Sequence, residues 1–292
     1  MRTIFAAAAL LALSACATTR GEPAGDSVIT AKAIRDIEKR SGGRLGIAVV
    51  DGRGKLVSAD RGHERFAMCS TFKLLLAGQV LERAAKGASL RTPLPFTRGD
   101  LVSYSPGTEK LVGADGKGEQ RLGFAARDAV ALSDNTAANL ILKHIGGPAA
   151  FTAALQRAGD SVTRLDRIEP ELNENAPGDE RDTTSPIAMA TSAASYVFGD
   201  RLQPDYRKQL RGWMIESETG LKRIRAGLPQ GWVAGDKTGT CGTAYNDVAF
   251  VETPDGKKYV IAIYLDRPTV EGEAASAIIA DATRILAADL PD

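Results

Sequence analysis

Strand-forming segments lie near both ends of the chain, and this placement constrains the fold more than any other feature. Residues 46–50 and 56–57 are rich in Val, Ile and Leu and flank a turn that holds two glycines. Residues 248–251 and 259–265 repeat the pattern around a Pro-Asp-Gly turn. Each pair is typical of two strands joined by a turn. Because residues 274–288 follow as an Ala- and Ile-rich segment with helical spacing, we predict one α/β lobe with an antiparallel sheet, built from both chain ends.

The middle of the chain is predicted to be helical. Helical spacing of apolar residues, interrupted by Gly and Pro, marks five segments: 71–86, 124–132, 137–145, 149–158 and 187–198. Gly87 lies where a helix C-terminus favours a left-handed residue. Residues 167–182 form a long irregular stretch, and such loops are usually functional. A chain of 292 residues can hold two lobes. We therefore predict a helical lobe inserted into the α/β lobe, with a cleft between them.

The N-terminus has the pattern of a bacterial export signal. Arg2 supplies the positive charge, and the apolar run that follows is too short to span a bilayer as a stable helix. The Leu-Ser-Ala-Cys motif that ends at Cys16 resembles a lipobox. It predicts removal of residues 1–15 as a signal peptide, lipidation of Cys16 and a tether over 16–26. Ordinary cleavage after Ala17 is the alternative, and both routes predict a periplasmic protein.

Composition and histidine content exclude several function classes. With 37 Lys and Arg against 36 Asp and Glu, the formal charge is +1, so no global field favours nucleic acid or an anionic membrane, although a local patch stays possible. The only histidines, His63 and His144, have no Cys or carboxylate at metal-ligand spacing, and both are expected at the surface. A Gly-x-Ser-x-Gly elbow is absent, which argues against an α/β-hydrolase. We therefore expect no metal and no cofactor.

Four short motifs occur in one order along the chain. They are Ser70-Thr71-Phe72-Lys73, Ser133-Asp134-Asn135, Glu169-Pro170-Glu171-Leu172-Asn173 and Lys237-Thr238-Gly239. Ser-x-x-Lys alone is weak evidence, because at about 6% usage of each residue it recurs about once per 300 residues. The two fully specified triplets in the right order are far less expected by chance. With these motifs the chain resembles class A serine β-lactamases over essentially its whole mature length.

The resemblance implies a fold and an activity. The fold is that of serine β-lactamases and penicillin-binding proteins, with an α/β lobe over 27–62 and 215–292 and a helical lobe over 63–214 that includes an Ω-loop at 167–182. The activity is hydrolysis of the β-lactam amide through an acyl-serine ester. The expected partners are β-lactam antibiotics, and the expected oligomeric state is a monomer.

The first motif supplies the nucleophile. Ser70 and Lys73 lie three residues apart at the start of a predicted helix, so their side chains share one face. A serine hydroxyl needs a base within hydrogen-bond distance, and Lys73 can be that base only if its pKa is lowered. At a helix N-terminus, the backbone N–H of Ser70 can also face a developing oxyanion. Lys73 and Glu169 both stay candidates for the acylation base.

The second motif lies between two predicted helices. By resemblance, Ser133 passes a proton to the departing ring nitrogen and the Asn135 amide binds the side-chain carbonyl of the substrate. Asp134 is expected to hold the turn together. Helix capping by the whole triplet is the alternative, since Ser, Asp and Asn all cap well.

Lys237-Thr238-Gly239 is expected on an edge strand that faces the cleft. Its cation and hydroxyl fit a substrate carboxylate, and Gly239 lets a ligand approach the backbone. By resemblance, the N–H of Thr240 is the second oxyanion donor, and its hydroxyl can also reach the carboxylate. Arg223 matches a position from which some family members offer a further cation, and Tyr104 matches an aromatic wall at the cleft mouth. The alternative for both cations is a solvated surface charge.

Glu169 and Asn173 separate the hydrolases from the transpeptidases and sensors that share the other motifs. An acyl-serine ester persists unless a positioned base activates water against it. Glu169 as the base and Asn173 as the water-orienting group meet that need. The surrounding segment resembles the class A Ω-loop, for which we expect an ion pair between Arg167 and Asp182 and a cis Glu169–Pro170 peptide.

Once Cys16 is assigned to the export signal, Cys69 and Cys241 remain as a pair. In an exported protein they lie in an oxidising compartment, where disulfides form. Cys69 directly precedes Ser70, and Cys241 follows the Lys237 motif, so the two sulfurs approach each other if both motifs line one cleft. A disulfide is the prediction, and two buried free thiols are the alternative. The placement of Cys69, Cys241, Thr240 and Arg223 resembles the subset of class A enzymes that hydrolyse carbapenems.

Overall fold

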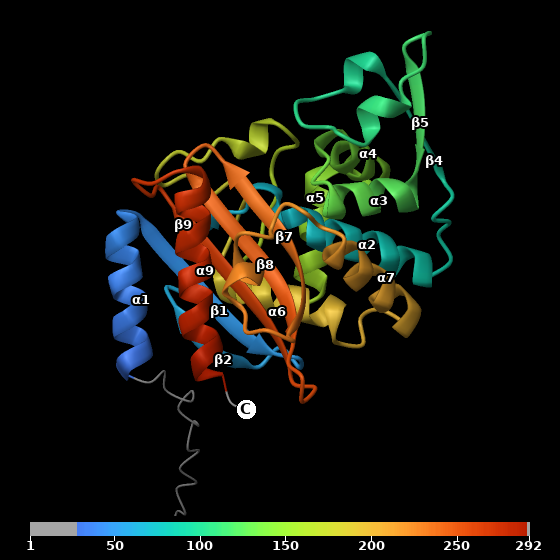
Figure 1. Ribbon diagram of the computed structural model, residues 1–292. Helices are drawn as coiled ribbons and strands as arrows, with labels where there is room; N and C mark the ends of the chain where they lie inside the picture. The colour runs from blue at the N-terminus through green and yellow to red at the C-terminus, as the bar shows by residue number, and fades with distance from the viewer. Residues whose placement is uncertain (1–27, 291–292) are drawn as a thin grey trace, which may run out of the picture.

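The computed structural model describes residues 28–290 and contains one main sheet of five antiparallel strands. The strand order is β2-β1-β9-β8-β7, so the first two strands of the chain pair with its last three (Figure 1). The strands are β1 (Arg44–Asp51), β2 (Leu56–Asp60), β7 (Val233–Cys241), β8 (Ala244–Glu252) and β9 (Lys258–Asp266). This arrangement confirms a sheet built from both chain ends.

Both faces of the sheet are covered. Helices α1 (Val28–Ser41) and α9 (Gly272–Asp289) lie side by side on one face (Figure 1). On the other face, α6 (Pro186–Val197) packs against β1 and β9. Successive residues of a strand therefore enter different cores: Val49 and Ile261 pack with α9, whereas Val50 and Val260 pack with the helical region. Burial on both faces explains why these strands are continuously apolar.

The helical region surrounds one fully packed helix. Helix α2 (Phe72–Ala85) is buried at every position from Phe72 to Leu81, so it forms the centre of the region. The helices around it are α3 (Leu122–Ala131), α4 (Asn135–Ile145), α5 (Gly147–Arg157) and α7 (Pro204–Ile215), and the one-turn helix α8 (Ile224–Gly227) lies against the sheet. Short elements complete the chain: β3 (Phe66–Ala67) with β6 (Thr183–Thr184), β4 (Pro93–Thr97) with β5 (Lys117–Arg121), and the 3-10 turns η1 (Cys69–Thr71), η2 (Arg98–Asp100), η3 (Thr108–Leu111) and η4 (Glu171–Asn173).

The two-lobed α/β architecture is confirmed, and Gly87 is left-handed with φ +100° at the end of α2. Several elements were not predicted, among them α7, α8, the β3–β6 pair and the β4–β5 hairpin. The signal peptide at 1–15, the lipidation of Cys16 and the tether at 16–26 lie outside the described residues. Within 28–290, no helix combines the length and the apolar character that a bilayer crossing requires. The domain boundaries stay a prediction.

Candidate active site

Ser70 and Lys73 lie at the junction of η1 and α2, which extends into the helical core. Ser70 is half-buried, and Lys73 is completely buried. Lys73 Nζ donates to Ser70 Oγ at 3.0 Å and lies 3.0 Å from Glu169 Oε1. Burial lowers the pKa of Lys73, and the Glu169 charge opposes this shift. The Ser–Lys pair therefore has the contact that a nucleophile and a base require.

The second motif occupies the turn between α3 and α4, as predicted. Ser133 adopts a left-handed conformation with φ +59°, and this places its carbonyl and hydroxyl against two different lysines. Its carbonyl accepts from Lys73 Nζ at 2.9 Å, and its Oγ accepts from Lys237 Nζ at 2.9 Å. Asn135 accepts from Lys73 and donates to the Ser103 carbonyl at 2.8 Å.

The environment of Asp134 differs from that of Ser133 and Asn135. Asp134 is fully buried and accepts from the N–H groups of Gly107, Thr108 and Ala137 at 2.8–2.9 Å. The Ala137 contact is the N-cap of α4. Helix capping therefore describes Asp134, whereas Ser133 and Asn135 contact the buried lysines.

Glu169 reaches the same centre from the irregular loop. Its Oε1 lies 3.5 Å from Ser70 Oγ, and its Oε2 accepts from Asn173 Nδ2 at 2.6 Å. The Glu169–Pro170 peptide is cis, as expected. Asn139 of α4 holds the main chain of Glu169 from both sides, accepting from its N–H at 3.0 Å and donating to its carbonyl at 2.8 Å. Sequence reasoning missed Asn139, because an Asn within a helix pattern gives no signal of a partner 30 residues away.

The neck of this loop is closed by a buried carboxylate. Asp182 accepts from the N–H groups of Asp166 and Arg167 at 2.7 and 2.9 Å. It also accepts from Arg167 Nε at 2.6 Å, which confirms the expected ion pair. Because these bonds fix both ends of the loop, they also fix the position of Glu169.

The opposite wall of the site is the edge strand β7. Lys237 is fully buried, and burial together with the Lys73 charge lowers its pKa to about 7. Arg223 is 7% exposed and donates to the Gly239 carbonyl at 3.0 Å and to Thr240 Oγ1 at 2.6 Å. The alternative of solvated surface charges is therefore wrong for both cations. Burial lowers the pKa of Arg223 as well.

Gly239 lies where protein backbone approaches closely, a constraint that the sequence did not predict. A Cβ at this position would lie 2.6 Å from the Met68 carbonyl and 3.2 Å from the Cys69 Cβ. The space is filled by the segment that precedes the nucleophile, because β7 packs directly against it. The glycine thus permits close approach of protein backbone at this face.

These walls enclose a cleft of about 560 Å³. The cleft is lined by Ser70, Ser103, Tyr104, Ser133, Asn135, Pro170, Asn173, Thr219, Arg223, Thr238, Thr240 and Cys241. Lys73, Glu169 and Lys237 lie beneath this lining. Tyr104 is 60% exposed at the rim. Thr219 was not predicted, and its Oγ1 lies 2.7 Å from Thr238 Oγ1.

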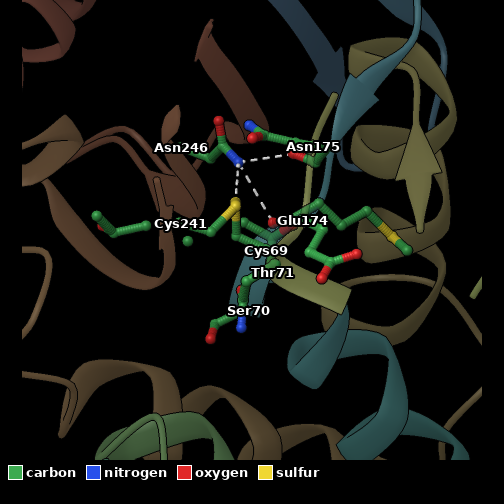
Figure 2. The surroundings of a disulfide bond; sticks show 12 residues. Cys69, Ser70, Thr71, Glu174, Asn175, Cys241 and Asn246 are labelled. Carbon is green, nitrogen blue, oxygen red and sulfur yellow. Dashed lines mark hydrogen bonds between the residues drawn. A yellow bond between two sulfur atoms is a disulfide. The ribbon is translucent and has the colours of Figure 1, made fainter. Parts of the chain in front are cut away.

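A disulfide joins the two sides of the cleft. Cys69 and Cys241 are bonded across 172 residues of sequence, with Cα atoms 5.6 Å apart. Figure 2 shows the bond directly beside Ser70, with the Asn246 amide pointing at the same segment. Asn246 Nδ2 donates to the Ala67 carbonyl at 2.9 Å. The predicted pairing is confirmed, and the alternative of free thiols is wrong.

The chemistry available at this site is that of serine, lysine and carboxylate groups. Across residues 28–290, no group of three or more His, Cys, Asp or Glu residues is placed to hold a metal ion. His63 and His144 are exposed, as predicted. A hydroxyl nucleophile, a buried base and a cationic wall are the parts needed to transfer an acyl group to serine and then to water.

Comparison with known proteins gives consistent matches over the whole fold. A sequence model described as the Beta-lactamase enzyme family matches residues 29–290. Beta-lactamase FAR-1 of Nocardia farcinica is 42% identical over 97% of this chain and 93% of its own length. Beta-lactamase L2 of Stenotrophomonas maltophilia is 40% identical over 94% and 91%.

Solved structures give the same result. The ancestral GNCA class A β-lactamase superposes with a TM-score of 0.84 at 49% identity, covering 88% of this chain and 98% of its own. A β-lactamase from Xanthomonas campestris superposes with a TM-score of 0.85 at 38% identity, covering 90% and 98%.

Proposed function

The chain belongs to the β-lactamase enzyme family and is a class A serine β-lactamase, and we propose that it hydrolyses penicillins and cephalosporins through an ester on Ser70. The observation that carries this proposal is the convergence of Ser70, Lys73 and Glu169. Lys73 Nζ lies 3.0 Å from both Ser70 Oγ and Glu169 Oε1. The nucleophile and both candidate bases therefore share one network.

In the acylation step, Ser70 Oγ attacks the β-lactam carbonyl carbon. The proton of the hydroxyl goes to Lys73 or Glu169, the two groups that contact it. The N–H groups of Ser70 and Thr240 stabilise the oxyanion. When the ring C–N bond breaks, the nitrogen takes a proton from Ser133, whose Oγ accepts a hydrogen bond from Lys237. The product is an ester on Ser70 with an opened ring.

In the deacylation step, Glu169 removes a proton from a water that attacks the ester. Asn173 Nδ2 lies 2.6 Å from Glu169 Oε2 and orients the same water. The ester bond breaks, Ser70 Oγ regains a proton, and the penicilloate leaves. A base held on two sides, by Asn173 and by the Asn139 contacts to its main chain, supports hydrolysis over a stable adduct.

The β7 wall recognises the substrate carboxylate. Thr238 and Thr240 present hydroxyl groups to the cleft, and Lys237 and Arg223 lie beside them as cations. The Asn135 amide binds the side-chain carbonyl of the substrate, and Tyr104 at the rim packs on its ring system. Penicillins and cephalosporins carry both a carboxylate and a side-chain carbonyl.

We further propose that the enzyme hydrolyses carbapenems. Carbapenem esters stall many serine hydrolases because they relax into geometries that water attacks poorly. The Cys69–Cys241 bond joins the residue before the nucleophile to the end of the substrate-binding strand. A fixed wall keeps the ester carbonyl aimed at its oxyanion donors. Imipenem turnover faster than that of a class A enzyme without the bond is the expected result, and equal turnover contradicts this proposal.

Mass spectrometry after mixing with benzylpenicillin tests the main proposal. We expect complete conversion to penicilloate and no lasting mass increase on the protein. A stable adduct on the wild-type protein contradicts hydrolysis and indicates a penicillin-binding peptidase or a sensor, because both acylate and stop.

The location of the protein is a separate proposal. We propose export to the periplasm as a monomer, with a lipid anchor on Cys16. Labelled palmitate should be incorporated into the wild-type protein and be absent from Cys16→Ala. A soluble, unlabelled wild-type protein would favour ordinary signal cleavage.

A further inference from the structure

Two carboxyl groups are buried side by side behind the substrate-binding wall. Asp236 of β7 and Asp247 of β8 are both 0% exposed, and each carboxyl interacts electrostatically with the other. In the β7–β8 register, Asp247 pairs with Thr238 and Asp236 pairs with Ala249, so both carboxyls project on one face as diagonal neighbours. That face is the one covered by α8 and α9.

The hydrogen bonds of this pair are incomplete without an added proton. Asp247 Oδ2 accepts from the Ile224 N–H at 3.0 Å. Within the described chain, Arg225 Nε forms an ion pair with Asp236 Oδ1 without the angle of a hydrogen bond, and no N–H or O–H donor is placed for Asp236 Oδ2 or Asp247 Oδ1. Unpaired buried oxygens are costly, and two adjacent carboxylates also repel each other. A proton on one carboxyl makes it a donor to the other and removes both costs.

The surroundings decide which carboxyl carries the proton. Burial raises the pKa of Asp236, but Arg225 lies against this carboxyl, opposes the rise and favours its ionised form. Asp247 has one oxygen occupied by a backbone donor, and its remaining Oδ1 is the free position. Burial, followed by the charge of Asp236, raises the pKa of Asp247 well above its ordinary value.

We propose that Asp247 Oδ1 carries a proton that it donates to Asp236, and that this acid–carboxylate pair positions the carboxylate-binding end of the cleft. Two contacts connect the pair to that end. A Cβ on Gly220 would lie 1.4 Å from Asp236 Oδ2, so the segment that contains Gly220 rests on the carboxyl. This segment carries Thr219 and Arg223, which contact Thr238 and Thr240.

The pair also sets the charge beneath the binding site. The charged and titratable groups around the pair are Arg223 and Arg225 at α8 and Tyr245 on β8, on its own face of the sheet, and Lys237 on β7, Tyr264 on β9 and Lys73 on α2, on the opposite face. With one shared proton the pair contributes a single negative charge to this cationic group. A second negative charge would draw Lys237 and Arg223 away from an anionic substrate. Asp236 and Asp247 are thus positioning residues, and neither lines the cleft.

Infrared spectroscopy tests the proton directly. The wild-type enzyme at neutral pH, without substrate, should give the carbonyl-stretch band of a buried carboxylic acid, and Asp247→Asn should lack it. This readout does not depend on β-lactam hydrolysis, so its failure is distinct from failure of the proposed function. Absence of the band from the wild-type enzyme overturns the proposal.

Two matched substitutions test the positioning role, which rests on the proposed function. Asp247→Asn copies the protonated acid, because its Nδ2 can donate to Asp236 while its oxygen accepts from Ile224. We expect its KM for benzylpenicillin to stay within about twofold of wild type, whereas Asp247→Ala should raise KM about tenfold with a smaller loss in kcat. Equal impairment of the Asn and Ala variants, or a loss confined to kcat, overturns the role.

Discussion

Glu169 contacts three groups at once, and each contact has a different role. The Ser70 hydroxyl lies at 3.5 Å, the Lys73 amine at 3.0 Å and the Asn173 amide at 2.6 Å. The Lys73 contact holds the carboxylate charge in a site with no exposure to solvent. Asn173 contacts the other oxygen of Glu169. A water bound by the Glu169 carboxylate and the Asn173 amide would therefore be aimed at an ester on Ser70.

Glu169→Ala should separate the two steps of the reaction. The variant should still acylate, because Lys73 contacts Ser70 directly, and should deacylate about 10²–10⁴-fold more slowly. Rapid-quench mass spectrometry with benzylpenicillin should find the adduct accumulating. Glu171→Ala is the matched control, since Glu171 is an exposed carboxylate two residues away, and it should turn over like wild type. Ser70→Ala should form no adduct. Wild-type turnover by Glu169→Ala would contradict the assigned role.

Lys237 should make substrate capture pH-dependent. Its pKa is lowered to about 7 by burial and by Lys73, so the free enzyme loses this cation as pH rises through that value. For a substrate with a carboxylate, kcat/KM should therefore fall above about pH 7. Lys237→Arg should move the fall to higher pH, because guanidinium stays charged. An unchanged profile in this variant would show that another group titrates.

The same shift has a stability consequence of known sign. The unfolded chain holds a lysine proton up to about pH 10.4, whereas the folded chain releases it near 7. Between these values the unfolded state binds more protons, so this group makes the free energy of unfolding rise with pH. Denaturant titrations of wild type and Lys237→Met at several pH values should isolate this rise.

At the scale of elements, sequence patterns predicted the helices and hairpins that depend on local turn residues and apolar spacing. They missed features that depend on packing against distant parts of the chain. The hairpins and the helices around Gly87 and Gly146 follow from turn residues and apolar spacing, and both glycines are left-handed in the structure. Helix α7 was missed because most of its residues are polar, and only Leu210, Trp213 and Met214 are buried. Within the site, the ordered motifs contain the residues that the structure brings together around Ser70. Asn139 and Thr219 were missed, because each acts through a partner distant in sequence.

The Ω-loop should depend on Asp182 for its position. Asp182 is 1% exposed and accepts from two backbone N–H groups and from Arg167. Asp182→Ala leaves these donors unpaired, so we expect a loss of about 3 kcal/mol in the free energy of unfolding. Deacylation should slow more than acylation, since Glu169 lies on the loop.

Glu174→Ala is the control for this substitution. Glu174 also pairs with Arg167, but its side chain is 74% exposed, so its removal should change stability by less than about 0.5 kcal/mol. Denaturant unfolding and single-turnover kinetics measure the two effects. Equal slowing of acylation and deacylation by Asp182→Ala would mean that the loop does not act through Glu169.

At the scale of the whole molecule, the cleft exists because two regions of the chain meet along β7. Lys237 of the sheet donates to Ser133 of the helical region, and Asn246 of β8 donates to the Ala67 carbonyl, close to the nucleophile, at 2.9 Å. The disulfide adds a covalent link at the same junction. The catalytic groups are thus held from both regions, and movement at the junction would change all of their distances.

Replacing both cysteines by serine tests what this link contributes. Closing 172 residues reduces the entropy of the unfolded chain by an amount worth about 5 kcal/mol as an upper value. The double variant should therefore unfold at lower guanidinium concentration, and thiol titration of the denatured, unreduced wild-type protein should find neither Cys69 nor Cys241 free. If the bond also fixes the ester geometry, imipenem turnover should fall further than benzylpenicillin turnover at a temperature where both proteins are folded. A change in ester geometry must slow imipenem most, because its ester is the one that relaxes. Equal losses on the two substrates would therefore mean that the bond only stabilises the fold.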